Sequence, residues 1–276
     1  MPVLIRRSYL FVPGNRPDRF AKACAAGADA VIVDLEDAVP PAEKIAARAS
    51  IQAWLSPAHP VLIRVNGVES EWFHDDVTLC GEPGVAGIVL PKAERADDIR
   101  FLAGKAHSAT TSILPLIETG KGFWNASELA RTGLVQRLVF GSIDLQLDLG
   151  MSVDEEELLY FRSQLVLISH ITDLQPPIDG VTTAIDSTAQ VRSDTLRAKR
   201  LGFGAKLCIH PSQIHLVNEC FRPTPEDEAW ARRVTEAAAV ANGSVVAVDG
   251  KMVDRPILAR AEAILADLDR PLESGE

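Results

Sequence analysis

The sequence is poor in cysteine. Its 276 residues include four cysteines, at widely spaced positions 24, 80, 208 and 220, and no two of them form a CxxC pair or a Cys/His cluster. This spacing argues against a disulfide framework and against a structural zinc site. We therefore expect reduced, partly buried thiols.

Long apolar runs are also missing. No segment approaches the length of about 20 residues that a membrane-spanning helix needs. The first seven residues place their charges after a very short apolar stretch, which is the reverse of a secretory signal. The sequence therefore predicts a cytoplasmic protein that does not contact the membrane.

The usual nucleotide-binding motifs and a positive charge are absent as well. No GxGxxG follows the first predicted strand, and no GxxxxGK[ST] occurs. The formal net charge is -10 and the pI is about 5.1, which argues against binding nucleic acid through broad electrostatic attraction. Hydrophobic residues make up 47% of the chain and charged residues 24%, enough apolar material for a substantial core.

What the chain does contain is a repeated strand-then-helix pattern. Most of the apolar runs are followed by a segment of helical periodicity, as in 17–27, from Pro40 to Trp54 and from Glu155 to about Ile171. Eight such units predict a (β/α)₈ TIM barrel, an α/β fold, over an open doubly wound sheet, whose nucleotide fingerprints are missing. The eight runs are Tyr9 to Val12, Ala30 to Val33, Val61 to Val65, Gly87 to Leu90, Ile113 to Ile117, Leu138 to Phe140, Ile178 to Val181 and Ala205 to Ile209.

The last fifty residues depart from this repeat. Pro225 to Ala241 reads as a helix, Val245 to Val253 as a hairpin that turns at Asp249-Gly250, and Pro256 to Leu268 as a final helix. We expect a barrel domain at residues 1–222 and a helix-hairpin-helix extension at residues 223–276.

Polar side chains follow the apolar runs. In a barrel of this type the reacting groups stand at the carboxyl ends of the strands, so these positions are candidates for a site. Each could instead face solvent or cap a helix, but several carboxylates and cations around one mouth indicate function. The candidates are Asp34, Glu36, Asp37, Arg64, Asn66, Lys92, Glu94, Glu118, Asp144 and His210.

Glu118 and Asp144 occupy matching places after the fifth and sixth runs, and they predict a metal site. Two converging carboxylates repel each other unless a shared cation keeps them ionised. An oxygen-only set completed by waters and substrate suits Mg²⁺, and Mn²⁺ could substitute. The alternative for Asp144 is an N-cap on the following helix.

Seven segments, spread in order over nearly the whole chain, resemble the citrate lyase β-subunit family, within the HpcH/HpaI aldolase/citrate lyase grouping that also contains the malyl- and citramalyl-coenzyme A lyases. They are Leu10-Phe-Val-Pro-Gly-Asn-Arg-Pro17, Val33-Asp-Leu-Glu-Asp-Ala38, Ile63-Arg-Val-Asn66, Leu90-Pro-Lys-Ala-Glu94, Leu116-Ile-Glu-Thr119, Phe140-Gly-Ser-Ile-Asp144 and Cys208-Ile-His-Pro211. The resemblance implies a Mg²⁺-dependent lyase that acts on the bond between an acyl-thioester α-carbon and the carbonyl carbon of an oxo acid.

The resemblance also implies a role for single residues of the metal site. Glu118 and Asp144 match the metal ligands, and Glu36 and Asp37 match acids that hold metal-bound waters. Arg64 matches the arginine that grips the oxo acid, a task for which a planar guanidinium is suited. The alternative for Arg64 is a structural ion pair with Glu36 or Asp37.

Contacts to coenzyme A are implied at the rim of the barrel. Arg16 and Lys22, together with Arg19, would meet the phosphates, and His210 of the Cys-Ile-His-Pro motif joins this coenzyme A set. Solvated helix charges are the alternative for the arginines and the lysine.

The segment Asp249-Gly-Lys-Met-Val-Asp-Arg-Pro256 resembles the C-terminal lid of the coenzyme A lyases, which delivers an aspartate to a neighbouring subunit. Asp254 matches that aspartate, as acid or base, and a donated lid implies a homo-oligomer such as a trimer. The alternative is that Asp254 caps the final helix.

Together these residues predict a Mg²⁺-dependent carbon-carbon lyase for a malyl-, citramalyl- or citryl-type 3-hydroxyacyl-coenzyme A, which yields a 2-oxo acid and acetyl- or acyl-coenzyme A. One rival is a citrate lyase β subunit that acts on an acyl carrier protein within a multi-protein complex. Others are a non-catalytic metal and oxo-acid binding protein, and a pyruvate aldolase that does not use coenzyme A. The sequence does not choose among glyoxylate, pyruvate and oxaloacetate.

Overall fold

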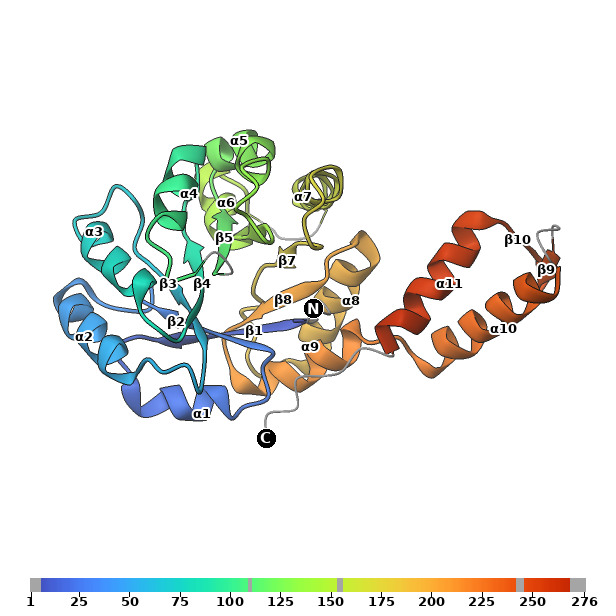
Figure 1. Ribbon diagram of the computed structural model, residues 1–276, viewed down its shortest axis with the longest axis horizontal. Coiled ribbons are helices and arrows are strands. Elements are labelled where there is room, and N and C mark those ends of the chain that lie inside the picture. The colour runs from blue at the N-terminus through green and yellow to red at the C-terminus, as the bar shows by residue number, and fades with distance from the viewer. Residues whose placement is uncertain (1–5, 109–110, 153–155, 242–245, 269–276) are drawn as a thin grey trace.

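A computed structural model describes residues 6–108, 111–152, 156–241 and 246–268 of the chain. Eight parallel strands close into a barrel in which each strand pairs with the next and β8 pairs with β1 (Figure 1). The predicted (β/α)₈ barrel is confirmed. The strands are β1 (Ser8–Pro13), β2 (Ala30–Asp34), β3 (Val61–Arg64), β4 (Val85–Leu90), β5 (Ser112–Ile117), β6 (Val139–Phe140), β7 (Ile178–Asp179) and β8 (Ala205–Cys208).

The strands are apolar almost throughout because the barrel buries both of their faces. Successive side chains alternate between the interior and the helix layer. On β3, for example, Leu62 belongs to the apolar cluster inside the barrel and Ile63 to the larger cluster outside it. Residues two positions apart on a strand therefore line the same space, and this rule decides which polar residues reach the mouth.

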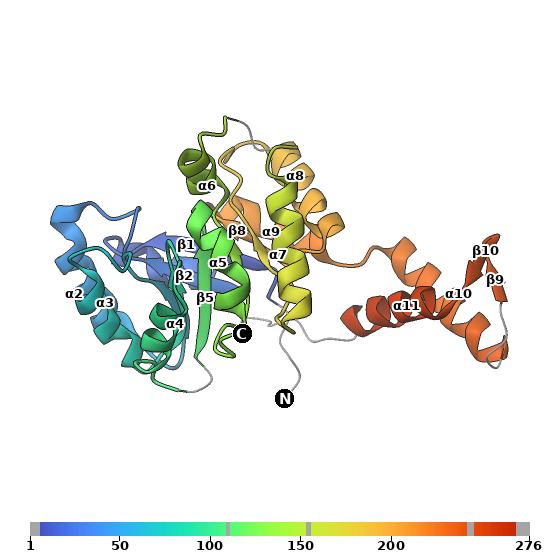
Figure 2. The ribbon, with the colours of Figure 1, turned by 90° about the horizontal axis from the view of Figure 1, so that it is seen from above.

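Helices cover the outside of the barrel (Figures 1 and 2). Short 3₁₀ turns lead into several of them, at Pro17–Arg19, Pro41–Glu43 and Pro211–Gln213, and another, Val77–Gly81, follows α3. The helices are α1 (Phe20–Cys24), α2 (Lys44–Trp54), α3 (Phe73–Asp76), α4 (Ala96–Ala103), α5 (Gly120–Ala130), α6 (Ser142–Leu149), α7 (Leu159–Ile171), α8 (Thr188–Leu201) and α9 (Ile214–Phe221).

Two helices differ from the sequence-based expectation. The segment between the sixth strand and the helix expected from Glu155 forms a helix of its own, α6, which ends at Gly150 in the left-handed conformation with a φ of 68°. The next helix, α7, begins at Leu159, whereas Glu155 was the expected start. Glu155 lies outside the described residues, and Glu156 and Glu157 precede the helix.

A buried arginine closes the amino-terminal end of the barrel. The Nε of Arg137, just before β6, donates to the carbonyl of Pro176 at 2.7 Å, and its Nη1 donates to the carbonyl of Arg6 at 2.8 Å. The guanidinium also contacts the hydroxyl of Tyr9, whose ring points into the barrel from β1. These bonds join the starts of three strands, so the interior is filled at this end.

The extension consists of α10 (Pro225–Ala241), the hairpin β9 (Val246–Val248) and β10 (Lys251–Val253), and α11 (Arg255–Leu268). The hairpin turns at Asp249 and Gly250, with φ values of 52° and 73°, as the Asp-Gly pair predicts. The extension has its own small core and projects away from the barrel (Figures 1 and 2). An ion pair of 3.0 Å between Arg7 and Asp267 joins α11 to the barrel. Val245 and residues 269–276 lie outside the described residues.

The cysteines and the lengths of the helices bear on two expectations from the sequence. All four cysteines are free, and burial raises the pKa of Cys80 and Cys208 to about 12. Within the described residues, every helix is too short or too polar to cross a bilayer.

Candidate active site

Three charged side chains enter the barrel mouth because they stand at inward-facing positions. Asp34 follows the interior residue Ile32 by two positions at the end of β2, and Arg64 follows Leu62 in the same way on β3. Glu118 comes two positions after Leu116, just beyond β5. Asp34, Arg64 and Glu118 line a cavity of about 390 Å³, with Asp144 and Ser142 of α6 and apolar side chains that include Phe11, Leu116 and Leu207.

Asp34 holds Arg64 in a fixed orientation. The Nε and Nη2 of Arg64 donate to the two carboxylate oxygens of Asp34, both at 2.6 Å. These residues are register partners on β2 and β3, and Asp34 is fully buried. The guanidinium also lies over the ring of Phe11, 4.7 Å from its centroid. Two parallel charge-assisted bonds fix the plane of the guanidinium, so its remaining N–H groups have defined directions.

Glu36 is the next partner of Arg64. Its Oε2 lies 3.0 Å from the Nη1 of Arg64, while Asp37, at the exposed rim, is 3.7 Å from the same nitrogen. Burial alone would lower the pKa of Arg64, but the carboxylates of Asp34, Glu36 and Asp37 outweigh it and raise that pKa. The structural ion pair that the sequence left open for Arg64 is therefore present, but its main partner is Asp34.

Glu118 is a buried carboxylate in an unfavourable environment. It is 2% exposed, and one oxygen accepts the backbone N–H of Lys92 at 2.8 Å. Burial and the nearby charges of Glu36 and Asp144 raise its pKa to about 8. A group in this position is protonated at neutral pH unless a cation compensates its charge.

Asp144 is brought to Glu118 by the start of α6. It is the third residue of that helix, and it lines the same cavity as Glu118. The alternative interpretation of Asp144 as an N-cap is wrong, because Gly141 occupies the cap position and no side chain caps the helix. The carboxylate of Asp144 is therefore available to a ligand in the cavity.

The donor set fits magnesium. Among the described residues no group of three or more His, Cys, Asp and Glu side chains gathers as a metal site. Mg²⁺ is usually held by one or two protein carboxylates together with waters and substrate oxygens, whereas structural zinc needs about four protein ligands. A pair of carboxylates, one of them buried with a raised pKa, beside an open cavity matches the first pattern.

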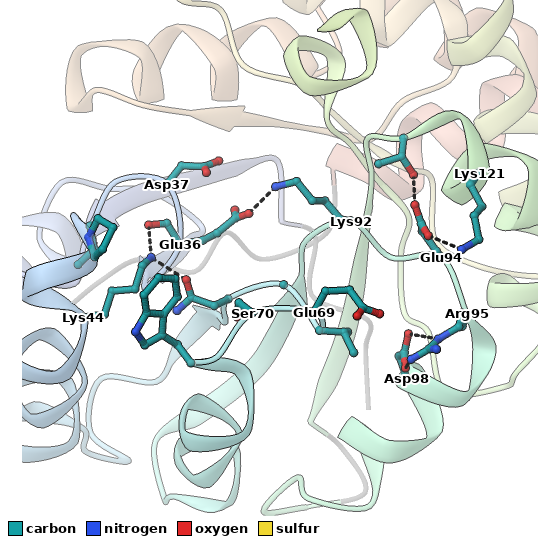
Figure 3. Close-up of a pocket in the computed structure, with 17 residues that line it drawn as sticks. Glu36, Asp37, Lys44, Glu69, Ser70, Lys92, Glu94, Arg95, Asp98 and Lys121 are labelled. Atoms are coloured by element: carbon teal, nitrogen blue, oxygen red, sulfur yellow. Dashed lines mark hydrogen bonds and ion pairs between the residues drawn. The ribbon is translucent and has the colours of Figure 1, made fainter. Parts of the chain in front are cut away.

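Lys92 connects this site to a second cavity. The second cavity, of about 540 Å³, is lined by loops that follow β2, β3, β4 and β5 (Figure 3). Figure 3 shows Lys92 directed at Glu36. Its ammonium lies 2.8 Å from Oε1 of Glu36. Lys44 lies deeper in its wall, where its ammonium donates to the carbonyls of Leu35 and Glu36 and to Asn66.

Asp34 and Lys92 hold Arg64 and Glu118 in place, although the sequence assigned no role to either. Both belong to the set of polar residues that follow the apolar runs, and that position was the available signal. Their partners lie 30 and 26 positions further along the chain, at Arg64 and Glu118. Only the closed barrel brings each pair together.

The residues expected to contact coenzyme A lie outside the cavity. Arg16 forms two bonds with Asp18, at 2.9 and 2.8 Å, and Lys22 is exposed on α1. His210 is exposed and caps the 3₁₀ turn at Pro211–Gln213, with its Nδ1 at 2.7 Å from the hydroxyl of Ser212. None of the three is among the residues that line the cavity.

Asp254 is separated from this site within one chain. It precedes α11, and its Oδ1 accepts the backbone N–H of Ile257 at 3.1 Å. The helix cap that the sequence left open is therefore present. The segment between β10 and α11 belongs to the extension, which projects away from the barrel (Figure 1).

Comparison with known proteins identifies the family to which this chain belongs. The sequence profile of the HpcH/HpaI aldolase/citrate lyase family matches residues 7–211. The chain belongs to this family. The family comprises aldolases and lyases, and the resemblance carried by the seven motifs of the sequence is confirmed.

Individual known proteins are similar over nearly their whole length. A citrate lyase subunit beta-like protein of Deinococcus radiodurans is 38% identical, over 96% of this chain and 98% of that protein. A (3S)-malyl-CoA thioesterase of Cereibacter sphaeroides is 34% identical, over 94% and 96%. The structure of CitE from Mycobacterium tuberculosis, in complex with magnesium, acetoacetate and coenzyme A, has a TM-score of 0.86 at 32% identity and covers 96% of this chain and 99% of CitE.

Proposed function

We propose that this protein is a Mg²⁺-dependent carbon-carbon lyase. Its substrate would be a malyl-, citramalyl- or citryl-type 3-hydroxyacyl-coenzyme A, and its products a 2-oxo acid and acetyl- or acyl-coenzyme A. The observation that carries the proposal is the convergence of Glu118, Asp144 and Arg64 on one cavity at the barrel mouth. Membership of the HpcH/HpaI family and the ligands in the CitE structure support it.

Glu118 and Asp144 would hold Mg²⁺, with Glu36 and Asp37 beside them to hold its waters. When bound, Mg²⁺ would supply a Lewis acid for the oxo-acid part of the substrate. Glu118 would be ionised in this state, because a cation offsets the burial and repulsion that raise its pKa. The backbone N–H of Lys92 keeps one of its oxygens in place.

Arg64 would bind the carboxylate of the oxo acid. A guanidinium has five N–H donors, and two of them donate to Asp34, while Nη1 lies 3.0 Å from Oε2 of Glu36 as an ion pair. The others are free to face the cavity, and Asp34 prevents the group from turning away. Arg64 would therefore orient the oxo acid and stabilise negative charge that develops on it as the carbon-carbon bond breaks.

Asp254 of a neighbouring subunit would act as the general acid or base in the proton transfer at the α-carbon of the released thioester. The extension that carries Asp254 projects away from the barrel of its own chain (Figure 1), which supports this. We accordingly propose a homo-oligomer, such as a trimer, in which residues 223–276 of one chain cover the barrel formed by residues 1–222 of the next. Closed cyclic symmetry gives every barrel one lid.

Arg16, Lys22 and His210 would meet the phosphates of coenzyme A at the rim of the barrel. Arg16 would exchange its bonds to Asp18 for a phosphate, which is a stronger acceptor with more charge. We also propose that the protein works in the cytoplasm, where four free thiols remain reduced.

The proposal is tested with purified protein, Mg²⁺ and a panel of malyl-, citramalyl- and citryl-coenzyme A. We expect one thioester to be cleaved to its oxo acid and acyl-coenzyme A, and removal of Mg²⁺ by a chelator to stop the reaction. Turnover that requires an acyl carrier protein would identify a citrate lyase β subunit instead. Mg²⁺-dependent binding of pyruvate, glyoxylate or oxaloacetate without turnover of any thioester would identify a binding protein.

A further inference from the structure

Lys92 contacts Glu118 through its backbone and Glu36 through its side chain. Its backbone N–H donates to Oε1 of Glu118 at 2.8 Å, and its ammonium donates to Oε1 of Glu36 at 2.8 Å. Glu36 in turn lies 3.0 Å from Arg64 through its other oxygen. One residue therefore links the proposed metal ligand to the acid that contacts the proposed oxo-acid arginine.

The backbone of Lys92 is in the left-handed region, with a φ of 46°. Most side chains disfavour this conformation, and glycine adopts it without a steric cost. A glycine at this position would donate the same N–H to Glu118 but would leave Glu36 without its ammonium partner. The presence of lysine at a position whose backbone favours glycine indicates that its side chain has a task of its own.

The task follows from the charges around Glu36. Glu36 is 7% exposed, so its carboxylate depends on protein partners, and those are Arg64 and Lys92. Without the ammonium, Glu36 would interact with Arg64 alone and would compete more strongly for the Nη1 that an oxo acid needs. With the ammonium, the negative charge of Glu36 is shared and Arg64 keeps donors for the ligand.

We propose that Lys92 is a positioning residue with two separable roles: its backbone N–H orients Glu118 for the metal, and its side chain shares the negative charge of Glu36 so that Arg64 keeps donors for the oxo acid. The inference depends on the proposed function, since it assumes a metal at Glu118 and an oxo acid at Arg64. It predicts that changes to the side chain weaken binding of the oxo acid and leave binding of the metal intact.

The experiment measures Mn²⁺ affinity, pyruvate affinity in saturating Mn²⁺ and metal-free melting temperature for Lys92→Gly, Lys92→Met and Lys92→Arg. We expect Mn²⁺ affinity close to wild type in all three, because each keeps the N–H. Loss of a charged hydrogen bond should weaken pyruvate binding about tenfold or more in the Gly and Met variants. Lys92→Arg keeps a cation and should recover most of this loss. Lys92→Gly should melt no lower than wild type, because glycine relieves the backbone.

Lys121→Met is the matched control. Lys121 lines the same second cavity and pairs with Glu94 at 2.8 Å, and it should not affect pyruvate binding. Wild-type pyruvate affinity in Lys92→Met would overturn the proposal, as would a loss of Mn²⁺ affinity in Lys92→Gly as large as that in Glu118→Ala. Wild-type protein that binds Mn²⁺ but no pyruvate, glyoxylate or oxaloacetate would overturn the proposed function, and the role of Lys92 with it.

Discussion

Gly141 lies directly against the carboxylate of Glu118. A Cβ added to Gly141 would approach Oε2 of Glu118 to 2.5 Å and would also overlap its Cβ. Gly141 is the residue before α6, the helix that carries Asp144, so its lack of a side chain allows the two carboxylates to share a cavity.

Gly141→Ala should displace Glu118 and weaken metal binding in a protein that still folds. We expect Mn²⁺ affinity to fall about 10-fold to 100-fold, the range seen when residues that orient metal ligands are altered. Titration calorimetry measures it. Gly67→Ala is the control, because a Cβ there meets no atom within 4 Å. Equal Mn²⁺ affinities in the two variants would contradict the role of Gly141.

Asp34→Asn should lower both stability and oxo-acid affinity. It leaves the buried guanidinium of Arg64 without its charged partner, and breaking a buried ion pair from one side costs about 3–5 kcal/mol. Urea denaturation measures the loss. The exposed pair of Arg16 and Asp18 provides the comparison, and Asp18→Asn should leave the unfolding midpoint unchanged. If Asp34→Asn unfolds at the wild-type urea concentration, the pair is not a stabilising anchor.

The stability of the metal-free protein should fall as the pH rises through the range in which Glu118 ionises. The pKa of Glu118 is about 8 in the folded chain, against an ordinary value of 4.5, so the folded state binds this proton more tightly. Its contribution to the free energy of unfolding is therefore largest below pH 4.5 and is lost between about pH 4.5 and 8.

Melting curves of wild type and Glu118→Gln across this pH range test the expectation. The wild-type melting temperature should decline relative to that of the variant, whose residue 118 does not titrate. Saturating Mg²⁺ should reduce the decline, because the cation stabilises the ionised carboxylate. Parallel curves for the two proteins would show that Glu118 titrates near its ordinary pKa.

Asp254→Asn should slow turnover without affecting Mn²⁺ binding. Asparagine is as good an N-cap as aspartate, so α11 keeps its start while the carboxylate is lost. Removal of a general acid or base typically costs about 10²-fold to 10⁴-fold in rate. A comparable loss of metal affinity would argue against this role.

Mixed oligomers reveal whether Asp254 acts in a neighbouring subunit. Asp254→Asn and Glu118→Gln chains are each expected to have little activity alone. After subunit exchange in equal amounts, about one quarter of the sites should combine an intact barrel with an intact lid from the next chain. Activity that stays at the level of the separate variants would mean that both residues act within one chain.

The barrel could be predicted from the sequence because its strands are buried on both faces. Each therefore appears as a short apolar run, and the predicted ends lie within two residues of the observed strands. Helix α6 was not predicted, since Ile143 and Leu147 are exposed and its few residues give no apolar face.

The site was predictable residue by residue but not in its pairings. The strand ends identified Arg64, Glu118 and Asp144, and all three line the cavity. That Asp34 would hold Arg64 depends on the register of β2 against β3, which no local pattern records. The left-handed backbone of Lys92 was equally hidden, because lysine is not a residue that signals it.

Arg137 and Tyr9 fill the amino-terminal end of the barrel, so the interior does not form a through-channel. Every molecule that reaches Glu118 has to enter by the opposite mouth, and under the proposed function both products would leave by the same route. Whatever covers that mouth therefore governs arrival and departure together, and a slow lid would limit the whole cycle even if bond cleavage were fast.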